Sequence, residues 1–353
     1  MEKKERNPWL DFLRSIAIIL VVNCHIGSTI RDIEGAQSLT SILGLGGHGV
    51  DLFFVLSGWL LGLLLFKELK ISGSINAKRF IVRRWLRTLP AYYAVLFFTL
   101  IQAAYSDNLD YKSTSFSVFL QTYSYQKLPF FGVSWSLCVE EHFYLIIGPS
   151  LLFLRNRPKA MIGFLAALLI MPVCFRYLGL YETLQQSHVR LDQCAAGVFL
   201  AYLKVYQQMI WDRLQRFQAH LLAFATATVT WLLLGRLGIL STKETYVLFS
   251  IISMCVIIQS DQRSYSKFIA STFWNFIATR SYAIYLLHVE AIVVCRRLAL
   301  DDGGLKQFTV TWLMSLLLAE FLYRVVELPG MRFREHKILA KYLECSPKAH
   351  PDR

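Results

Sequence analysis

Long apolar segments recur along almost the whole chain, and they constrain its fold more than any other feature. A helix needs about 20 mainly apolar residues to cross the hydrocarbon core of a bilayer. Ten segments approach that length, centred on residues 9–27, 49–66, 90–105, 135–154, 160–178, 193–206, 219–237, 245–258, 281–297 and 308–325. With 55% hydrophobic residues among 353, the chain is more apolar than an ordinary soluble domain. The sequence therefore predicts an all-α, polytopic membrane bundle of about ten helices.

Lysine and arginine residues are concentrated in alternate connections between these segments. Most of the 37 lie on the cytoplasmic side if the amino terminus is cytoplasmic, so the positive-inside rule predicts that both termini are in the cytoplasm. The formal net charge of +13 follows from this arrangement. Nucleic-acid binding is not predicted, because the basic residues are spread over short segments beside membrane exits and form no basic soluble domain.

The chain shows no internal repeat and no hydrophilic stretch long enough to fold alone. We therefore expect one membrane domain over residues 1–330, followed by a short basic cytoplasmic tail at 331–353. The seven cysteines are scattered and form no Cys-x-x-Cys pair, so neither a disulfide framework nor a metal site is predicted. The first apolar segment has no small-residue cleavage site, and we interpret it as a retained helix rather than a signal peptide.

Two polar residues share one face of the first segment. Arg14 and His25 are 11 residues apart in WLDFLRSIAIILVVNCHIG, which in a helix is about three turns and about 16 Å. A charge inside a membrane helix costs about 2.5 kcal/mol or more and usually marks a pathway or a site. Histidine, with an unperturbed pKa of about 6.5, can take and release a proton. The structural alternative is that Arg14 pairs with Asp11 and that His25 lies at the outer interface.

Carboxylates lie near the outer ends of two further segments. Asp51, in GVDLFFVLSG, could orient a nearby histidine as the acid of a triad does, or it could simply cap its helix. Glu140, Glu141 and His142, in SWSLCVEEHFYL, lie about one turn inside the membrane, where two adjacent carboxylates suggest a general base or an acid that orients an imidazole. Neighbouring helical residues point about 100° apart, so one glutamate is expected to face the cavity of His25.

A cluster of arginines precedes the third apolar segment. Arg83, Arg84 and Arg87, in RFIVRRWLRTLPAYY, belong to the most basic cytoplasmic connection. Arg84 and Arg87 can point together from one helical turn, and guanidinium groups bind phosphates in a bidentate manner. The alternative is that these residues bind anionic lipid headgroups or only fix the topology. His288, in SYAIYLLHVE, is expected to make a structural hydrogen bond between helices.

In this order, these segments resemble acyltransferase family 3, the integral membrane O-acyltransferases that modify bacterial surface glycans. The matching pieces are Arg14-x10-His25, GVDLFFVLSG at 49–58, Arg84-x-x-Arg87 with Pro90, SLCVEEHFYL at 136–145, SYAIYLLH at 281–288 and Glu327-x-Pro329. The chain departs from the family at His142, where glutamine is usual, and at Cys24, where a bulky apolar residue is common. Many relatives carry an extracytoplasmic esterase-like domain after the last helix. Only about 25 residues follow Pro329 here, so we expect the membrane domain itself to modify the acceptor.

The resemblance implies that an acetyl or other short acyl group passes from cytoplasmic acyl-CoA to a sugar hydroxyl, in the bacterial inner membrane and without a permanently bound cofactor. Arg84 and Arg87, with Arg83 beside them, would bind the CoA phosphates, and Arg14 would steady the thioester or the pantetheine arm. His25 would act as general base on the acceptor or, alternatively, carry the acyl group. Its orienting acid would be Glu140, Glu141 or Asp51.

Two other classes of protein also place polar residues in a membrane. A transporter or flippase of a lipid-linked glycan would more often show two related halves with helices broken by Gly or Pro. A non-catalytic membrane scaffold would not need Arg14, His25 and two adjacent glutamates inside its helices. The sequence favours the enzyme and indicates neither the acceptor nor the oligomeric state.

Overall fold

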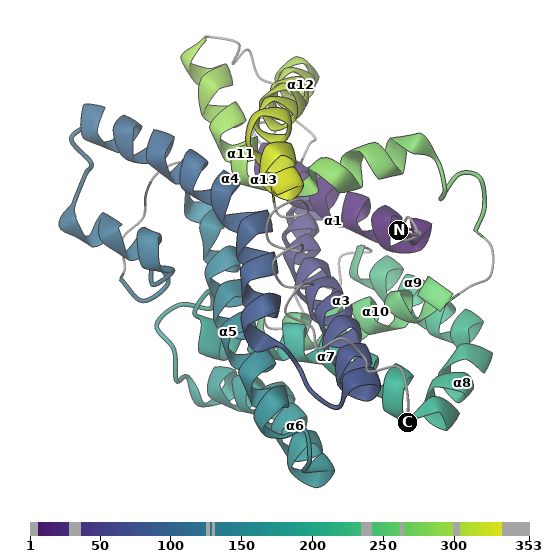
Figure 1. Ribbon diagram of the computed structural model, residues 1–353. Helices are drawn as coiled ribbons and strands as arrows, with labels where there is room; N and C mark the ends of the chain where they lie inside the picture. Colours follow the sequence, from purple (N-terminus) through teal and green to yellow (C-terminus); the bar gives the residue numbers. More distant parts are fainter. Residues whose placement is uncertain are drawn as a thin grey trace.

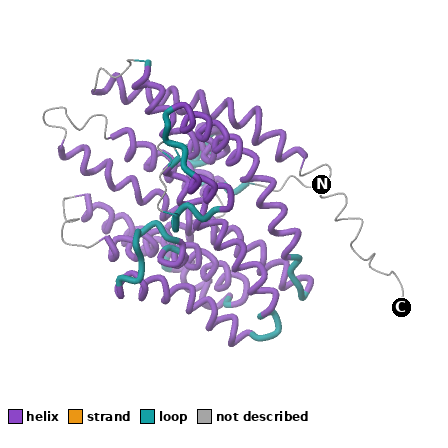
Figure 2. Tube along the Cα trace, turned by 90° about the vertical axis from the view of Figure 1, so that its left-hand side faces the viewer, coloured by secondary structure: helices purple, strands orange, loops and turns teal. Residues whose placement is uncertain are grey.

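The computed structural model describes residues 6–27, 37–124, 128, 131–233, 242–261, 265–298 and 304–333. Within these ranges all regular structure is helical, and no strand occurs (Figure 2). The predicted all-α class is therefore confirmed for the described part of the chain. The tail expected at 331–353 lies outside the described residues from position 334 onward.

The main helices are joined by short connections, several of which contain a 3-10 turn. In chain order they are α1 (Pro8–Ile26), α2 (Gln37–Gly44), α3 (Gly49–Ser72), α4 (Ala77–Tyr105), α5 (Trp135–Phe153), α6 (Pro158–Leu178), α7 (Leu191–Tyr206), α8 (Gln208–Arg216), α9 (Gln218–Leu233), α10 (Thr242–Ile258), α11 (Thr272–Arg297), α12 (Gly304–Leu322) and α13 (Leu328–Phe333). The 3-10 turns are η2 (Leu45–His48), η3 (Tyr111–Val118), η4 (Gly132–Ser134), η5 (Ser187–Val189) and η7 (Gln259–Asp261). A π-helical stretch, η8 (Tyr323–Glu327), joins α12 to α13.

Several of these helices have the length and composition of membrane spans. Among the described residues, seven stretches qualify: Pro8–Ile26, Ile42–Ser72, Ala77–Tyr105, Pro158–Leu178, Lys243–Asp261, Thr272–Arg297 and Leu305–Phe333. The segments predicted at 135–154, 193–206 and 219–237 also form helices, but α7 and α9 have only 16 residues each and α5 contains Glu140 and Glu141. The chain is thus a multi-pass membrane protein, and the count of ten stays a prediction.

The long helix α3 crosses the middle of the bundle and packs most extensively against α7 (Figure 1). Two glycines allow this close contact. A Cβ on Gly58 of α3 would lie 1.9 Å from the carbonyl oxygen of Cys194, and a Cβ on Gly197 of α7 would lie 2.0 Å from that of Val55. Small residues let membrane helices approach backbone to backbone. Gly58 and Gly197 therefore allow α3 and α7 to pack at this close distance.

The helix α4 begins earlier than expected. The prediction started this span near residue 90, but α4 begins at Ala77 and continues through Pro90 to Tyr105. Its start is capped by Asn76, whose Oδ1 accepts a hydrogen bond from the backbone N–H of Arg79 at 2.8 Å. Arginine is a good helix former. A run of basic residues can therefore belong to a helix inside the bundle where neighbouring helices form hydrogen bonds with its side chains. The three arginines that were expected in a connection, Arg83, Arg84 and Arg87, thus lie within α4.

Candidate active site

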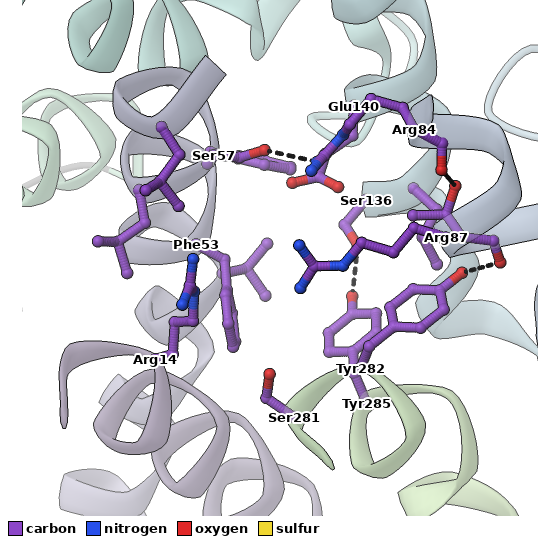
Figure 3. Close-up of a pocket in the computed structure, with 16 residues that line it drawn as sticks. Arg14, Phe53, Ser57, Arg84, Arg87, Ser136, Glu140, Ser281, Tyr282 and Tyr285 are labelled. Atoms are coloured by element: carbon purple, nitrogen blue, oxygen red, sulfur yellow. Dashed lines mark hydrogen bonds between the residues drawn. The ribbon is translucent and has the colours of Figure 1, made fainter. Parts of the chain in front are cut away.

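A cavity of about 130 Å³ lies among α1, α3, α4, α5 and α11. Its wall combines apolar side chains with three arginines and one glutamate (Figure 3). The lining residues are Arg14, Val50, Phe53, Phe54, Leu56, Ser57, Leu60, Arg84, Arg87, Thr88, Ser136, Leu137, Glu140, Ser281, Tyr282 and Tyr285. We call this space the arginine cavity. Because cations outnumber carboxylates in its lining, the cavity suits an anionic ligand.

Arg84 is held in place by two neighbouring helices. Its Nη2 donates to the Ser57 hydroxyl of α3 at 3.4 Å and to the Tyr144 hydroxyl of α5. The guanidinium carbon lies 4.5 Å from the centre of the Tyr144 ring, which adds a cation–π contact. Ser57 and Tyr144 are themselves joined by a hydrogen bond of 2.7 Å. The orientation of Arg84 is therefore fixed before any ligand arrives.

The other predicted arginines divide between the cavity and its surroundings. Arg14 and Arg87 point toward the space from α1 and α4 (Figure 3). Arg14 also donates to Asp11 Oδ1 at 2.9 Å, so the i, i+3 pair of the structural interpretation exists while Arg14 still lines the cavity. Arg83 is half-buried and is not one of the lining residues. The structure therefore brings Arg14, Arg84 and Arg87 together and leaves Arg83 outside.

The two adjacent glutamates have different surroundings. Glu140 lines the arginine cavity, whereas Glu141 is turned to α4. There its Oε2 accepts a hydrogen bond from Trp85 Nε1 at 2.9 Å and its Oε1 accepts one from Thr88 Oγ1 at 3.3 Å. This division follows from the rotation between successive helical residues. Glu140 is therefore the carboxylate available to a ligand. The next residue after the two glutamates, His142, points elsewhere: its Nδ1 lies 2.8 Å from the hydroxyl oxygen of Ser187 in η5.

His25 lies next to the arginine cavity rather than in it. Among the described residues that line the cavity, His25 does not occur. Its Nδ1 lies 2.9 Å from the carbonyl oxygen of Val21 and 3.3 Å from Nε2 of His288 on α11. His288 in turn contacts the backbone of Tyr285, whose side chain lines the cavity. The prediction was that one glutamate faces the cavity of His25. Glu140 faces the arginine cavity instead, and His25 is not among the described residues that line it.

Asp51 belongs to a separate group of charges. Its Oδ2 lies 2.5 Å from His48 Nδ1, and its Oδ1 lies 2.5 Å from Arg190 Nη2. Both oxygens are thus bound by residues other than His25, which removes the support for Asp51 as the acid that orients His25. Next to them, Arg176 binds both oxygens of Asp192 at 2.9 and 2.7 Å. We call this group the ion-pair cluster, made of His48, Asp51, Arg176, Arg190 and Asp192.

The sequence interpretation did not select several side chains that shape this region. Ser57 and Tyr144 orient Arg84, and Tyr285 is fixed by a hydroxyl that donates to the Val133 carbonyl at 2.8 Å. All three residues lie in segments that match the family. The sequence therefore indicated the segments that form the site, but not these individual residues. Arg190, which binds Asp51, was not selected as a site residue either.

Comparison with known proteins settles the family. The profile of acyltransferase family 3, described as an acyltransferase domain, matches residues 7–322. The chain belongs to this family. The match confirms the predicted family and the predicted class of enzyme, an acyltransferase. It also contains every residue that lines the arginine cavity, together with His25 and His288.

Individual relatives of this acyltransferase come from Staphylococcus aureus. A protein of strain MSSA476 with a provisional O-acetyltransferase name is 28% identical over 384 residues, covering 96% of this chain and 59% of the relative. A protein of strain MRSA252 with the same kind of name matches equally. The O-acetyltransferase OatA of strain NCTC 8325 is 26% identical over 353 residues, covering 91% of this chain and 57% of the relative. The chain therefore spans somewhat less than three fifths of their length, and no solved structure matches it.

Proposed function

We propose that this acyltransferase moves an acetyl or other short acyl group from acyl-CoA to a hydroxyl of a glycan or glycolipid. The observation that carries the proposal is the arginine cavity, in which Arg14, Arg84 and Arg87 share a lining with one carboxylate, Glu140. The phosphates of CoA are anionic, and guanidinium groups bind phosphate through paired, charge-assisted hydrogen bonds. The proposal that the transferred group is acetyl is supported by the O-acetyltransferase names of the relatives.

The direction of transfer depends on a topology that we also propose. In it the bundle has about ten spans in the bacterial inner membrane, with both termini in the cytoplasm. Arg14 then lies in the inner half of α1 and His25 near its outer end. Acyl-CoA would enter from the cytoplasm, and the acceptor would approach from outside. Residues 1–330 would form the membrane domain that carries out the transfer, with residues 331–353 as its tail.

The residues divide the chemistry among them. His25 would take the proton of the acceptor hydroxyl as its oxygen attacks the thioester carbon, so that a C–O bond forms while the C–S bond breaks. The departing CoA thiolate would then receive that proton. Arg84 and Arg87 would bind the anionic part of the donor, and Arg14, about three helical turns from His25, would steady the pantetheine arm. In the other version of this chemistry, His25 itself carries the acyl group between donor and acceptor.

Replacement of His25 by alanine tests this proposal. Membranes that contain the wild-type or the His25→Ala protein would be incubated with radiolabelled acetyl-CoA, and the glycan and lipid fractions extracted. We expect label on sugar with the wild type and a loss of about 100-fold or more in the variant, the range found for removal of a general base. His220→Ala is the matched control, because His220 is an exposed histidine on α9, a helix that contributes no described residue to the arginine cavity.

Three results would have different meanings. Label on sugar at the wild-type rate in His25→Ala would contradict the catalytic role of His25. Movement of a lipid-linked glycan across the membrane without any label would instead support a transporter or flippase. Absence of both activities, with a folded wild-type protein, would contradict the proposed donor or acceptor.

A further inference from the structure

The hydrogen bonds of His288 determine which of its ring nitrogens carries the proton. The side chain is fully buried, with 0% of its surface exposed. Its Nδ1 lies 2.8 Å from the carbonyl oxygen of Tyr285 and 3.2 Å from that of Ile284. A carbonyl oxygen can only accept, so Nδ1 must be the protonated nitrogen. Because burial strongly disfavours the charged imidazolium, the ring is neutral and Nε2 carries its lone pair.

The tautomer of His288 in turn determines which ring nitrogen of His25 carries the proton. Nε2 of His288 lies 3.3 Å from Nδ1 of His25, with the two ring centres 4.9 Å apart. Since Nε2 of His288 is an acceptor, Nδ1 of His25 must donate. The carbonyl oxygen of Val21, 2.9 Å from the same Nδ1, independently requires a donor there. Both contacts therefore assign the proton of neutral His25 to Nδ1 and its lone pair to Nε2.

We propose that His288 is a positioning residue that holds His25 in the Nδ1–H tautomer, so that Nε2 of His25 is the nitrogen that takes the proton of the acceptor. This inference rests on the proposed function, in which His25 is the general base. His288 itself touches neither donor nor acceptor in this account. It acts through the ring of His25, from the position that the carboxylate occupies in a Ser-His-Asp triad.

A neutral orienting group fits this place in the bundle. When His25 takes a proton on Nε2 it becomes a cation, and its Nδ1–H donates more strongly to Nε2 of His288. A carboxylate in the place of His288 would also accept this hydrogen bond from His25, but it would add a second buried charge, which is costly within a membrane. The Val21 carbonyl also accepts from Nδ1–H, so loss of His288 should weaken the preference for one tautomer rather than abolish it.

The experiment measures the tautomer and the rate on the full chain in lipid nanodiscs. Nitrogen-15 NMR of protein labelled at histidine distinguishes a protonated ring nitrogen from a bare one, and the His25→Ala spectrum assigns the signals of His25. We expect a protonated Nδ1 and a bare Nε2 in the wild type. His288→Phe keeps a ring but removes the acceptor. It should give a mixture of tautomers and lower kcat by about 10- to 100-fold, as loss of other orienting groups does, with an unchanged KM for acetyl-CoA.

A second variant separates positioning from packing. In His288→Gln the amide oxygen can again accept from His25, so most of the lost rate and the single tautomer should return. The inference is wrong if His25 in the wild type carries its proton on Nε2, a result that needs no variant to fold. It is also wrong if His288→Phe keeps both the tautomer and kcat, or if His288→Gln is no better than His288→Phe. Full transfer by His25→Ala would instead overturn the proposed function, whatever the tautomer.

Discussion

The arginine cavity and the ion-pair cluster are both charged regions inside one apolar bundle, and they are built in opposite ways. In the cluster, Asp51 and Asp192 each meet an arginine at 2.5 and 2.7 Å. Arg190 also lies 3.8 Å from the centre of the Tyr246 ring. In the cavity, three arginines and one glutamate line a space of about 130 Å³. A buried charge needs a partner; the cavity arginines have protein partners too, such as Asp11 for Arg14, but the cavity also leaves room for a ligand beside them.

The comparison shows that a charge in a membrane helix is a poor guide to catalysis by itself. Asp51 and Glu140 both lie near the start of their helices, and the sequence offered both as the acid that orients His25. Asp51 joins α3 to η2 and to the start of α7 through His48 and Arg190. Glu140 lies against the cavity. We therefore assign Asp51 to the architecture of the bundle and Glu140 to the proposed site.

The largest expected effect follows from breaking the ion-pair cluster. Arg190→Leu would leave the buried carboxylate of Asp51 without its arginine, and loss of one partner from a buried pair costs about 3–5 kcal/mol. We expect a much smaller folded fraction after detergent extraction and a lower midpoint of thermal unfolding, measured by size-exclusion chromatography. Replacing both partners, in Asp51→Leu with Arg190→Leu, should recover part of that stability.

A variant in the cavity serves as the control for this prediction. Glu140→Gln should extract and unfold like the wild type, because its side chain lines the cavity. If Arg190→Leu were instead as stable as the wild type but inactive, the division between the two regions would be wrong. The cluster would then belong to the chemistry.

The fold was largely predictable where apolar residues are continuous. The segment expected at 9–27 forms α1 over Pro8–Ile26, and the one at 49–66 lies within α3. The start of α4 was not predictable in this way. Arg83, Arg84 and Arg87 lower the apparent hydrophobicity of its first half, while in the structure Arg84 is received by Ser57 and Tyr144. A hydropathy scale scores each side chain by its transfer to an apolar medium, whereas the guanidinium group of Arg84 is hydrogen-bonded to protein.

The site was predictable in its residue types more than in its pairings. The helical rotation indicated that Glu140 and Glu141 point apart, but the choice between them depends on Trp85 and Thr88 of α4. The partner of Asp51 is Arg190, 139 positions later in the chain, and no local spacing reports such a contact. Likewise, His288 was expected to be structural, and only its distance to His25 gives it a part in the proposed chemistry.

An intermediate effect is expected from the arginines of the cavity. Arg84→Gln and Arg87→Gln should each reduce kcat/KM for acetyl-CoA by about 10- to 100-fold, because a hydrogen bond to a charged group contributes about 1.5–3 kcal/mol. The loss should come mainly through KM, measured from initial rates at increasing donor concentration. Arg83→Gln is the matched control, since Arg83 belongs to the same helix but does not line the cavity. An unchanged KM in the first two variants would favour the lipid-binding or topological role of this arginine run.

The smallest expected effect, and the sharpest test of the division, comes from exchanging each glutamate for its isostere. Glu140→Gln removes the one carboxylate among the described lining residues without changing the side-chain volume, and it should alter the transfer rate while leaving the unfolding midpoint unchanged. Glu141→Gln keeps an amide oxygen that can still accept from Trp85 and Thr88. Because neutral acceptors are weaker, we expect a stability loss of about 1 kcal/mol with nearly normal transfer. Equal transfer defects in both variants would show that Glu141 also acts on the ligand, and the cavity would then have to extend behind α5 toward α4.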